Sequence, residues 1–241
     1  MINIYWAPWH HPSVYSERHL SYKKKPYWLI EEFNQKNNTS NKVDNFYKCP
    51  AFVNLVKNTL VLSNTSNIDI NITADGTIVN NDNEEKSHAP GLFSIKSPSE
   101  VNARTVNYSC NWIFFADKPV DIVSSPAYMH NTGLPACGYY VPGTFDISKW
   151  FRPLEFAFQM WPGSTKFKMA EDDPLMYVKF NTEEKINLQE FYMTPEIYSI
   201  SNSCVSLKNF SRVKALNKLY EVFRGSGMRE KLLTEIQKNI I

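Results

Sequence analysis

Short runs of β-branched and aromatic residues, each ended by turn residues, fill the chain from Cys49 to Met193. Among them are "AFVNLVKNTLVLS", "TVNYSCNWIFFAD", "LEFAFQMW" and "LMYVKFN", and polar residues alternate with apolar ones in "KFKM". A period of two is typical of strands that expose one face to water. The sequence "ADGT" at 74–77, between "DINIT" and "TIVN", predicts a hairpin. These patterns predict a mainly β fold, a sandwich or roll of about ten strands.

The two ends of the chain carry different patterns. At the start, "INIYWAPW" predicts an aromatic first strand ended by Pro8, and "PYWLIEEFNQ" predicts a short helix that begins at Pro26. After Pro195 the apolar residues recur at helical spacing, and Gly225 and Gly227 divide this stretch into a pair of amphipathic helices. We therefore expect a β-rich domain at 1–195 and a helical segment at 196–241, packed on that domain or on a partner.

Composition excludes several classes of protein. Of the 241 residues, 43% are hydrophobic and 14% aromatic, which is enough for a large core without metals or crosslinks. Lys+Arg 26 against Asp+Glu 24 leaves a net charge of +2, so no surface for duplex nucleic acid is expected. No apolar run is long enough to cross a membrane and no export signal is recognisable, which predicts a soluble protein. The four cysteines show no C-x-x-C spacing, which favours free thiols.

The window "CGYYVPGTFDISKWFRPLEFAF" at 137–158 holds most of the candidate ligand-binding residues. Asp146 could bind a ligand hydroxyl and Arg152 a carboxylate or phosphate, with Tyr140 and Trp150 as neighbouring aromatic walls. In the alternative interpretation, Asp146 caps its own turn and Arg152 pairs with Asp146 or Glu155. Both interpretations stay open from the sequence.

His130 in "PAYMHNTG" is the remaining candidate for the same pocket. It could act as a base or ligand, or it could be a structural histidine bonded to backbone. No H-x-D or H-x-E pair is present, so no metal site is predicted, and the cofactor is left unknown. No complete catalytic motif occurs, so the sequence does not decide whether the protein is an enzyme.

Two resemblances add to these patterns. Residues 138–180, with "GTFDISKWFRP", "LEFAF" and "KFKMAEDDPLMYVKF", resemble the closing part of the dUTPase and dCTP deaminase fold. A Ser-Ser-Gly phosphate motif and a glycine-rich C-terminal arm are missing, so this resemblance implies a dUTPase-like or cupin-like topology rather than nucleotide chemistry. The segments "MINIYWAPW", "YKCPAFVN", "NWIFF", "YMHN" and "FDISKWFRPLEF" resemble an uncharacterised family of tailed phages of marine cyanobacteria, more distantly similar to a bacterial domain family of unknown function.

Two functions follow as expectations. The first is a phage accessory protein in the host cytoplasm, whose β-roll pocket binds a small molecule or metal. The second is a virion or assembly component that forms a homo-oligomer through the aromatic N-terminus or the C-terminal helices.

Overall fold

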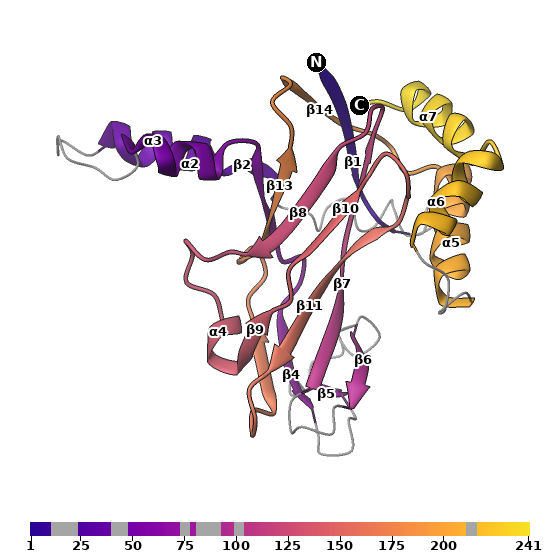
Figure 1. Ribbon diagram of the computed structural model, residues 1–241. Helices are drawn as coiled ribbons and strands as arrows, with labels where there is room; N and C mark the ends of the chain where they lie inside the picture. Colours follow the sequence, from indigo (N-terminus) through magenta and orange to yellow (C-terminus); the bar gives the residue numbers. More distant parts are fainter. Residues whose placement is uncertain (11–23, 40–47, 73–77, 81–92, 99–103, 211–215) are drawn as a thin grey trace.

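The computed structural model describes residues 1–10, 24–39, 48–72, 78–80, 93–98, 104–210 and 216–241. Within these ranges the chain is mainly β, with fourteen strands in three sheets and six helices. Figure 1 shows the sheets in the middle of the molecule, with α2 and α3 on one side and the C-terminal helices on the other. The predicted β-rich body with C-terminal helices is confirmed.

The largest sheet has the strand order β14-β1-β7-β11-β9, and β6 also pairs with β7. The first strand lies inside this sheet, antiparallel to β7 and parallel to β14. The strands are β1 (Ile2–Pro8), β6 (Phe93–Pro98), β7 (Arg104–Ala116), β9 (Gly138–Tyr140), β11 (Pro153–Met160) and β14 (Ile186–Glu190).

The second sheet has the order β10-β8-β13-β3-β2, and the third has the order β12-β4-β5. The predicted hairpin is confirmed by the antiparallel pairing of β4 with β5, although its turn lies outside the described residues. The strands are β2 (Tyr27–Trp28), β3 (Thr59–Ser63), β4 (Ile68–Ile72), β5 (Ile78–Asn80), β8 (Asp121–Pro126), β10 (Gly143–Asp146), β12 (Lys166–Met169) and β13 (Pro174–Asn181).

All three sheets share one hydrophobic core. On β1, Ile4 and Trp6 point into this core, whereas Tyr5 and Ala7 point to the opposite face of the sheet and into a second core. Successive residues of a strand face opposite sides, so a strand covered on both faces is apolar throughout. This double burial explains the aromatic first strand, whose Tyr5 and Trp6 are core residues rather than an exposed contact surface.

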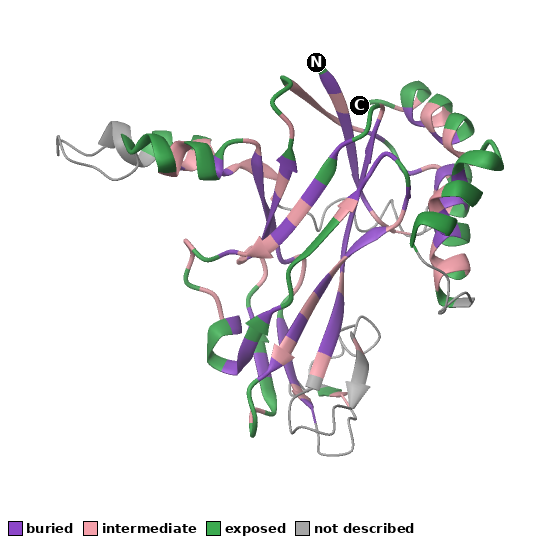
Figure 2. Ribbon diagram, viewed as in Figure 1, coloured by how far each residue is buried: buried purple, intermediate pink, exposed green. Residues whose placement is uncertain are grey.

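The second core forms where three helices cover the outer face of the largest sheet. They are α5 (Pro195–Phe210), α6 (Leu216–Gly225) and α7 (Met228–Lys238). Figure 2 shows their buried residues facing the sheet and their exposed residues facing outward. The sequence predicted two helices here, whereas the described residues form three, because residues 195–210 make a helix of their own, α5. Within the chain, these helices pack on the β-rich part.

A third core joins α2 (Leu29–Thr39) and α3 (Pro50–Val56) to the second sheet. The helix predicted from Pro26 is confirmed as α2, but it begins at Leu29, because Tyr27 and Trp28 pair with β3 as the strand β2. The strand predicted from residue 51 is wrong in its first half, which forms α3. Pro50 stands in the first turn of this helix, a position where its missing N–H costs nothing.

Candidate functional site

The predicted site residues lie at opposite ends of β8. Asp146 pairs with Asp121, where β8 begins, whereas His130 follows Pro126, where β8 ends. Five residue steps of about 3.3 Å put about 16 Å between these two ends. Tyr140 lies in the main core, with its hydroxyl 3.6 Å from a methionine sulfur. The structure therefore does not bring the predicted residues together around one pocket.

Asp146 organises the turn that follows β10. Its Oδ1 accepts hydrogen bonds from the backbone N–H of Ser148 at 2.8 Å and from the Ser148 hydroxyl at 2.6 Å. Its Oδ2 lies 2.8 Å from the ammonium of Lys149, and this hydrogen bond raises the pKa of Lys149. Asp146 is only 6% exposed. It thus caps the turn and fixes the two residues after it, as the alternative interpretation expected.

Arg152 and Trp150 make structural contacts of their own. The guanidinium of Arg152 lies 3.4 Å from the carboxylate of Glu155 and 5.7 Å from the centre of the Phe145 ring. Trp150 is buried in the second core, 5.9 Å from the ring of Phe223. Its indole Nε1 has no hydrogen-bond partner within the described part of the chain. Neither side chain lines a cavity described below.

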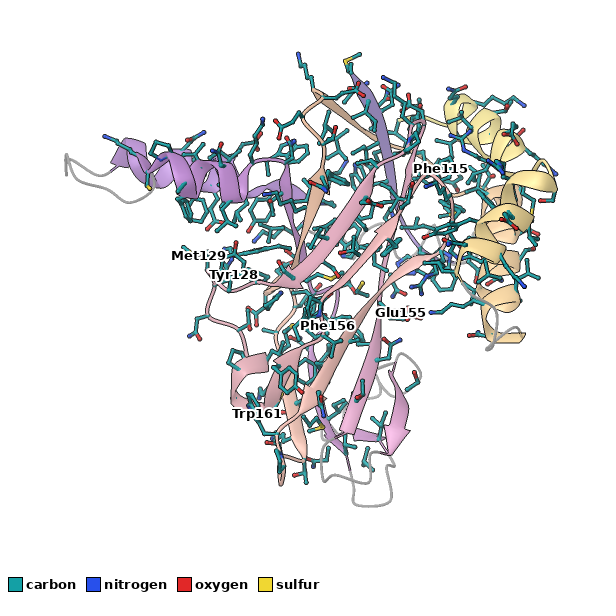
Figure 3. The ribbon with its side chains drawn as sticks, in the orientation of Figure 1. Phe115, Tyr128, Met129, Glu155, Phe156 and Trp161 are labelled. Atoms are coloured by element: carbon teal, nitrogen blue, oxygen red, sulfur yellow. The ribbon has the colours of Figure 1, made fainter. Side chains whose placement is uncertain are left out.

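His130 is held between a tyrosine and a carboxylate. Its Nδ1 lies 2.6 Å from the hydroxyl of Tyr177, and its Nε2 lies 3.0 Å from Oε2 of Glu32. Burial raises the pKa of Tyr177, so its hydroxyl stays neutral, and the direction of the two imidazole hydrogen bonds follows from the tautomer of His130. The Tyr177 oxygen also accepts the backbone N–H of Met129 at 3.2 Å. Figure 3 shows Met129 on the side of the molecule that carries α2.

This arrangement ties three elements together: α2 through Glu32, β13 through Tyr177 and the end of β8 through His130. Tyr177 is 1% exposed and cannot meet a substrate. Through these hydrogen bonds the cluster acts as a crosslink between the three elements. Sequence reasoning found His130 but missed Glu32, which is 98 positions away and carries no local signal.

A cavity of about 390 Å³ opens beneath the C-terminal helices. We call it the helix-side cavity. Its walls come from the turn capped by Asp146, the connection before β8, and helices α6 and α7. The lining residues are Pro119, Ser148, Lys149, Asn217, Tyr220, Glu221, Phe223, Arg224, Arg229 and Glu230. Volumes of this order suit small-molecule ligands.

Two cations of the helix-side cavity are fixed by the fold. The guanidinium of Arg229 donates to the carbonyl oxygens of Ser148 at 3.1 Å and of Asp117 at 2.7 Å, and it lies over the ring of Phe115. Lys149 is held by Asp146. These contacts anchor α7 to the turn, so the cavity is built before any ligand arrives.

Two oppositely charged side chains of α6 have no bonding partner within the described residues. Arg224 and Glu221 are exposed and line the cavity, and within the described ranges no hydrogen bond or ion pair engages either side chain. Residues three apart lie on the same side of a helix. The wall of α6 therefore presents one positive and one negative group together.

No family model, curated protein or solved structure matches this chain.

The helix-side cavity is lined mainly by polar and charged side chains. Its described lining includes no histidine or cysteine, and the Ser148 hydroxyl donates to Asp146 without a base between them. Across the described residues, no three side chains of the metal-ligating types gather closely enough to hold a metal ion. In the same part of the chain, no helix has the length and hydropathy to cross a membrane. A charged cavity with fixed walls fits the binding of a small molecule.

Proposed function

We propose that this protein is a phage-encoded accessory protein that binds a small zwitterionic molecule, of the amino acid type, in the helix-side cavity. Its origin is supported by the resemblance of segments such as "NWIFF" and "FDISKWFRPLEF" to a cyanophage family. The packing of three sheets on one core supports a sandwich, with a dUTPase-like or cupin-like topology as part of the proposal. The host cytoplasm is its proposed site of action.

The observation that carries the ligand assignment is the open pair of opposite charges on α6. Lys149 and Arg229 already have protein partners, whereas Arg224 and Glu221 do not within the described residues. A ligand carboxylate would pair with the planar guanidinium of Arg224, and a ligand ammonium would pair with Glu221. The partly buried Tyr220 and buried Phe223 supply an apolar wall for the rest of the ligand.

The test is isothermal titration calorimetry with a panel of L-amino acids, followed by the N-acetyl and carboxamide forms of the tightest binder. Each modified form removes one charge, so each should bind about tenfold more weakly, the loss expected for one charge-assisted hydrogen bond. Arg224→Gln should abolish the difference between the parent amino acid and its carboxamide. Glu221→Gln should abolish the difference between the parent and its N-acetyl form.

Lys231→Gln, at an exposed position on α7 that is not among the lining residues, is the matched control and should leave the affinity unchanged. Equal binding of the parent, the carboxamide and the N-acetyl form would contradict the zwitterion assignment. A panel without any binder would contradict the proposed function itself.

A second candidate function, a virion or assembly component, is favoured by one surface feature. Tyr139 and Trp161 are 43% and 44% exposed, and their ring centres lie 5.1 Å apart at the β9 edge of the largest sheet. Exposed aromatics at a sheet edge are typical of contact surfaces. Native mass spectrometry tests this: Trp161→Ser should turn an oligomer into a monomer. A wild-type monomer at high concentration would contradict it.

A further inference from the structure

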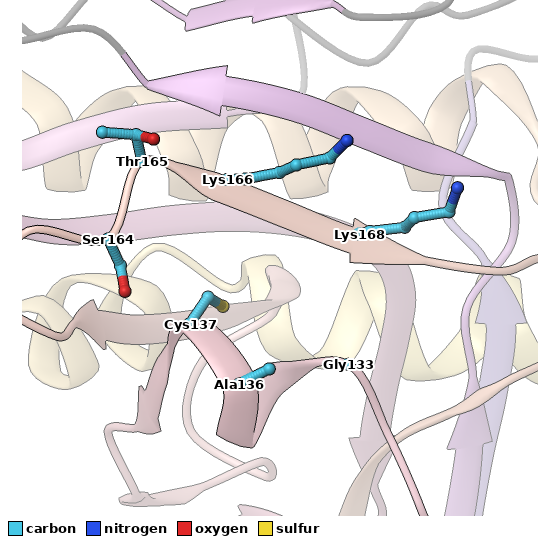
Figure 4. Close-up of a pocket in the computed structure, with 7 residues that line it drawn as sticks. All are labelled: Gly133, Ala136, Cys137, Ser164, Thr165, Lys166 and Lys168. Atoms are coloured by element: carbon cyan, nitrogen blue, oxygen red, sulfur yellow. The ribbon is translucent and has the colours of Figure 1, made fainter.

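A second cavity, of about 580 Å³, lies between α4 (Leu134–Cys137) and β12. We call it the α4–β12 cavity. Figure 1 shows α4 at the opposite end of the molecule from α7, so this cavity is separate from the helix-side cavity. Figure 4 shows its lining side chains, which come from two short segments. They are Gly133, Ala136, Cys137, Ser164, Thr165, Lys166 and Lys168.

The walls of the α4–β12 cavity are locked together by close backbone contacts. A Cβ atom on Gly133 would lie 2.0 Å from the carbonyl oxygen of Lys168, so only glycine lets the chain approach β12 this closely. On the other side, the indole N–H of Trp161 donates to the carbonyl of Pro135 at 3.1 Å. The backbone N–H of Trp161 donates to the carbonyl of Cys137 at 2.9 Å. The short helix is thus held on both sides, and the cavity is preformed.

The strand wall carries a positive charge. Lys166 and Lys168 alternate with Phe167 and Met169, which point into the core, so both ammonium groups lie on the outer face of β12. Both reach the carboxylate of Asp69, at 3.3 Å and 3.2 Å. One carboxylate neutralises one ammonium. A single positive charge is left over, and no acidic residue stands among the described lining residues to cancel it.

The remaining wall offers hydroxyl groups and an unreactive thiol. Ser164 and Thr165 add two hydroxyl groups to the lining. Burial raises the pKa of Cys137 to about 11, and its thiol donates to the carbonyl of Leu134 at 3.3 Å. The thiol is therefore protonated near neutral pH and contributes contact area rather than a nucleophile.

The geometry points to a binding site for a sugar phosphate in the α4–β12 cavity. The lysine ammoniums meet the phosphate, and the hydroxyls of Ser164 and Thr165 exchange hydrogen bonds with the hydroxyls of the sugar. Inorganic phosphate alone would leave most of the volume empty. A nucleotide base would find no amide, carboxylate or aromatic ring among the described lining residues to read its edge or stack on its face. This site is independent of the helix-side cavity.

The test is calorimetric titration of the full chain with glucose 6-phosphate, glucose, inorganic phosphate and AMP. Glucose 6-phosphate should bind at least about tenfold more tightly than each of the others, because it alone engages both the lysines and the hydroxyls. Glucose binding as tightly would contradict the role of the lysines. Inorganic phosphate or AMP binding as tightly would contradict the assignment of a sugar. No binding of glucose 6-phosphate would overturn the site.

Two variants locate the binding. Lys168→Gln removes the surplus charge and should weaken glucose 6-phosphate binding about tenfold. Ala136→Trp fills the cavity from an exposed position and should abolish binding without disturbing the core. Lys231→Gln is the matched control for the loss of one positive charge. Circular dichroism checks that each variant is folded, and unchanged binding in folded Ala136→Trp would overturn the proposal.

Discussion

The imidazole of His130 lies 2.6 Å from the hydroxyl of Tyr177, at the point where α2 meets the second sheet. Replacing Tyr177 by Phe leaves Nδ1 of His130 and the backbone N–H of Met129 without their partner. Because both groups are partly buried, we expect the free energy of unfolding to fall by about 1–3 kcal/mol. Urea denaturation measures this. The control, Tyr128→Phe, removes a hydroxyl from a 49% exposed residue and should change it by less than about 0.5 kcal/mol.

Asp146→Asn should weaken both the turn and the helix-side cavity. The neutral amide loses the ion pair of Oδ2 with Lys149, and its remaining oxygen is a weaker acceptor for Ser148 than the carboxylate. The expected loss of unfolding free energy is about 1–2 kcal/mol, measured by urea denaturation. Arg152→Gln, which breaks a partly exposed ion pair with Glu155, should cost less than about 1 kcal/mol. A larger effect for Arg152→Gln than for Asp146→Asn would contradict this ranking.

Gly133→Ala should destabilise the protein through a steric clash alone. Gly133 has an ordinary helical backbone, with φ −69°, so alanine causes no backbone strain there. Its Cβ would meet the carbonyl oxygen of Lys168, and α4 would have to move at a cost of about 1–3 kcal/mol. Gly225→Ala, which meets no atom within 4 Å, is the matched control. Equal melting temperatures for the two variants would show that α4 adjusts freely.

The ion pairs of Glu184 predict a pH dependence of stability. The N-terminal ammonium and Lys118 lower the pKa of this exposed carboxyl group to about 2. A carboxylate with a lowered pKa in the folded state stabilises above its unfolded pKa of about 4.3, and this contribution is lost as the pH falls toward 2. Wild type should therefore melt slightly above Glu184→Gln at pH 7, and the difference should vanish near pH 2.

Salt provides the control for this pH effect. Exposed ion pairs are screened, so the same difference between wild type and Glu184→Gln should also shrink in about 1 M salt at pH 7. A difference that persists at pH 2 would show that the glutamine itself perturbs the fold.

The four cysteines should react at different rates. Burial raises the pKa of Cys110 to about 12 and of Cys204 to about 11, whereas Cys49 is exposed. Only the thiolate is alkylated rapidly, so iodoacetamide at pH 8 should label Cys49 alone in the native protein. Mass spectrometry of the labelled peptides measures this. Rapid labelling of Cys110 would contradict its burial.

The candidate sites were only partly predictable from the sequence. The window around Asp146 was found because turn residues act locally, and Asp146 does cap its own turn. Its part in the helix-side cavity was not predictable, because the facing wall comes from α6 and α7, with Arg229 reaching back 81 positions to Ser148. The α4–β12 cavity depends on the contact of Gly133 with β12, which no local pattern indicates.

Local patterns were enough to predict the β-rich character, the first strand, the hairpin and the helical C-terminus, because side-chain periodicity and turn chemistry act over a few residues. The same patterns misassigned 51–56, since a short apolar run fits a strand and a helix alike. Tertiary structure alone decided that β1 pairs with β14 across 184 positions and that sheets and helices enclose two charged cavities. Such pairings depend on which apolar faces bury each other best, and that depends on the whole chain at once.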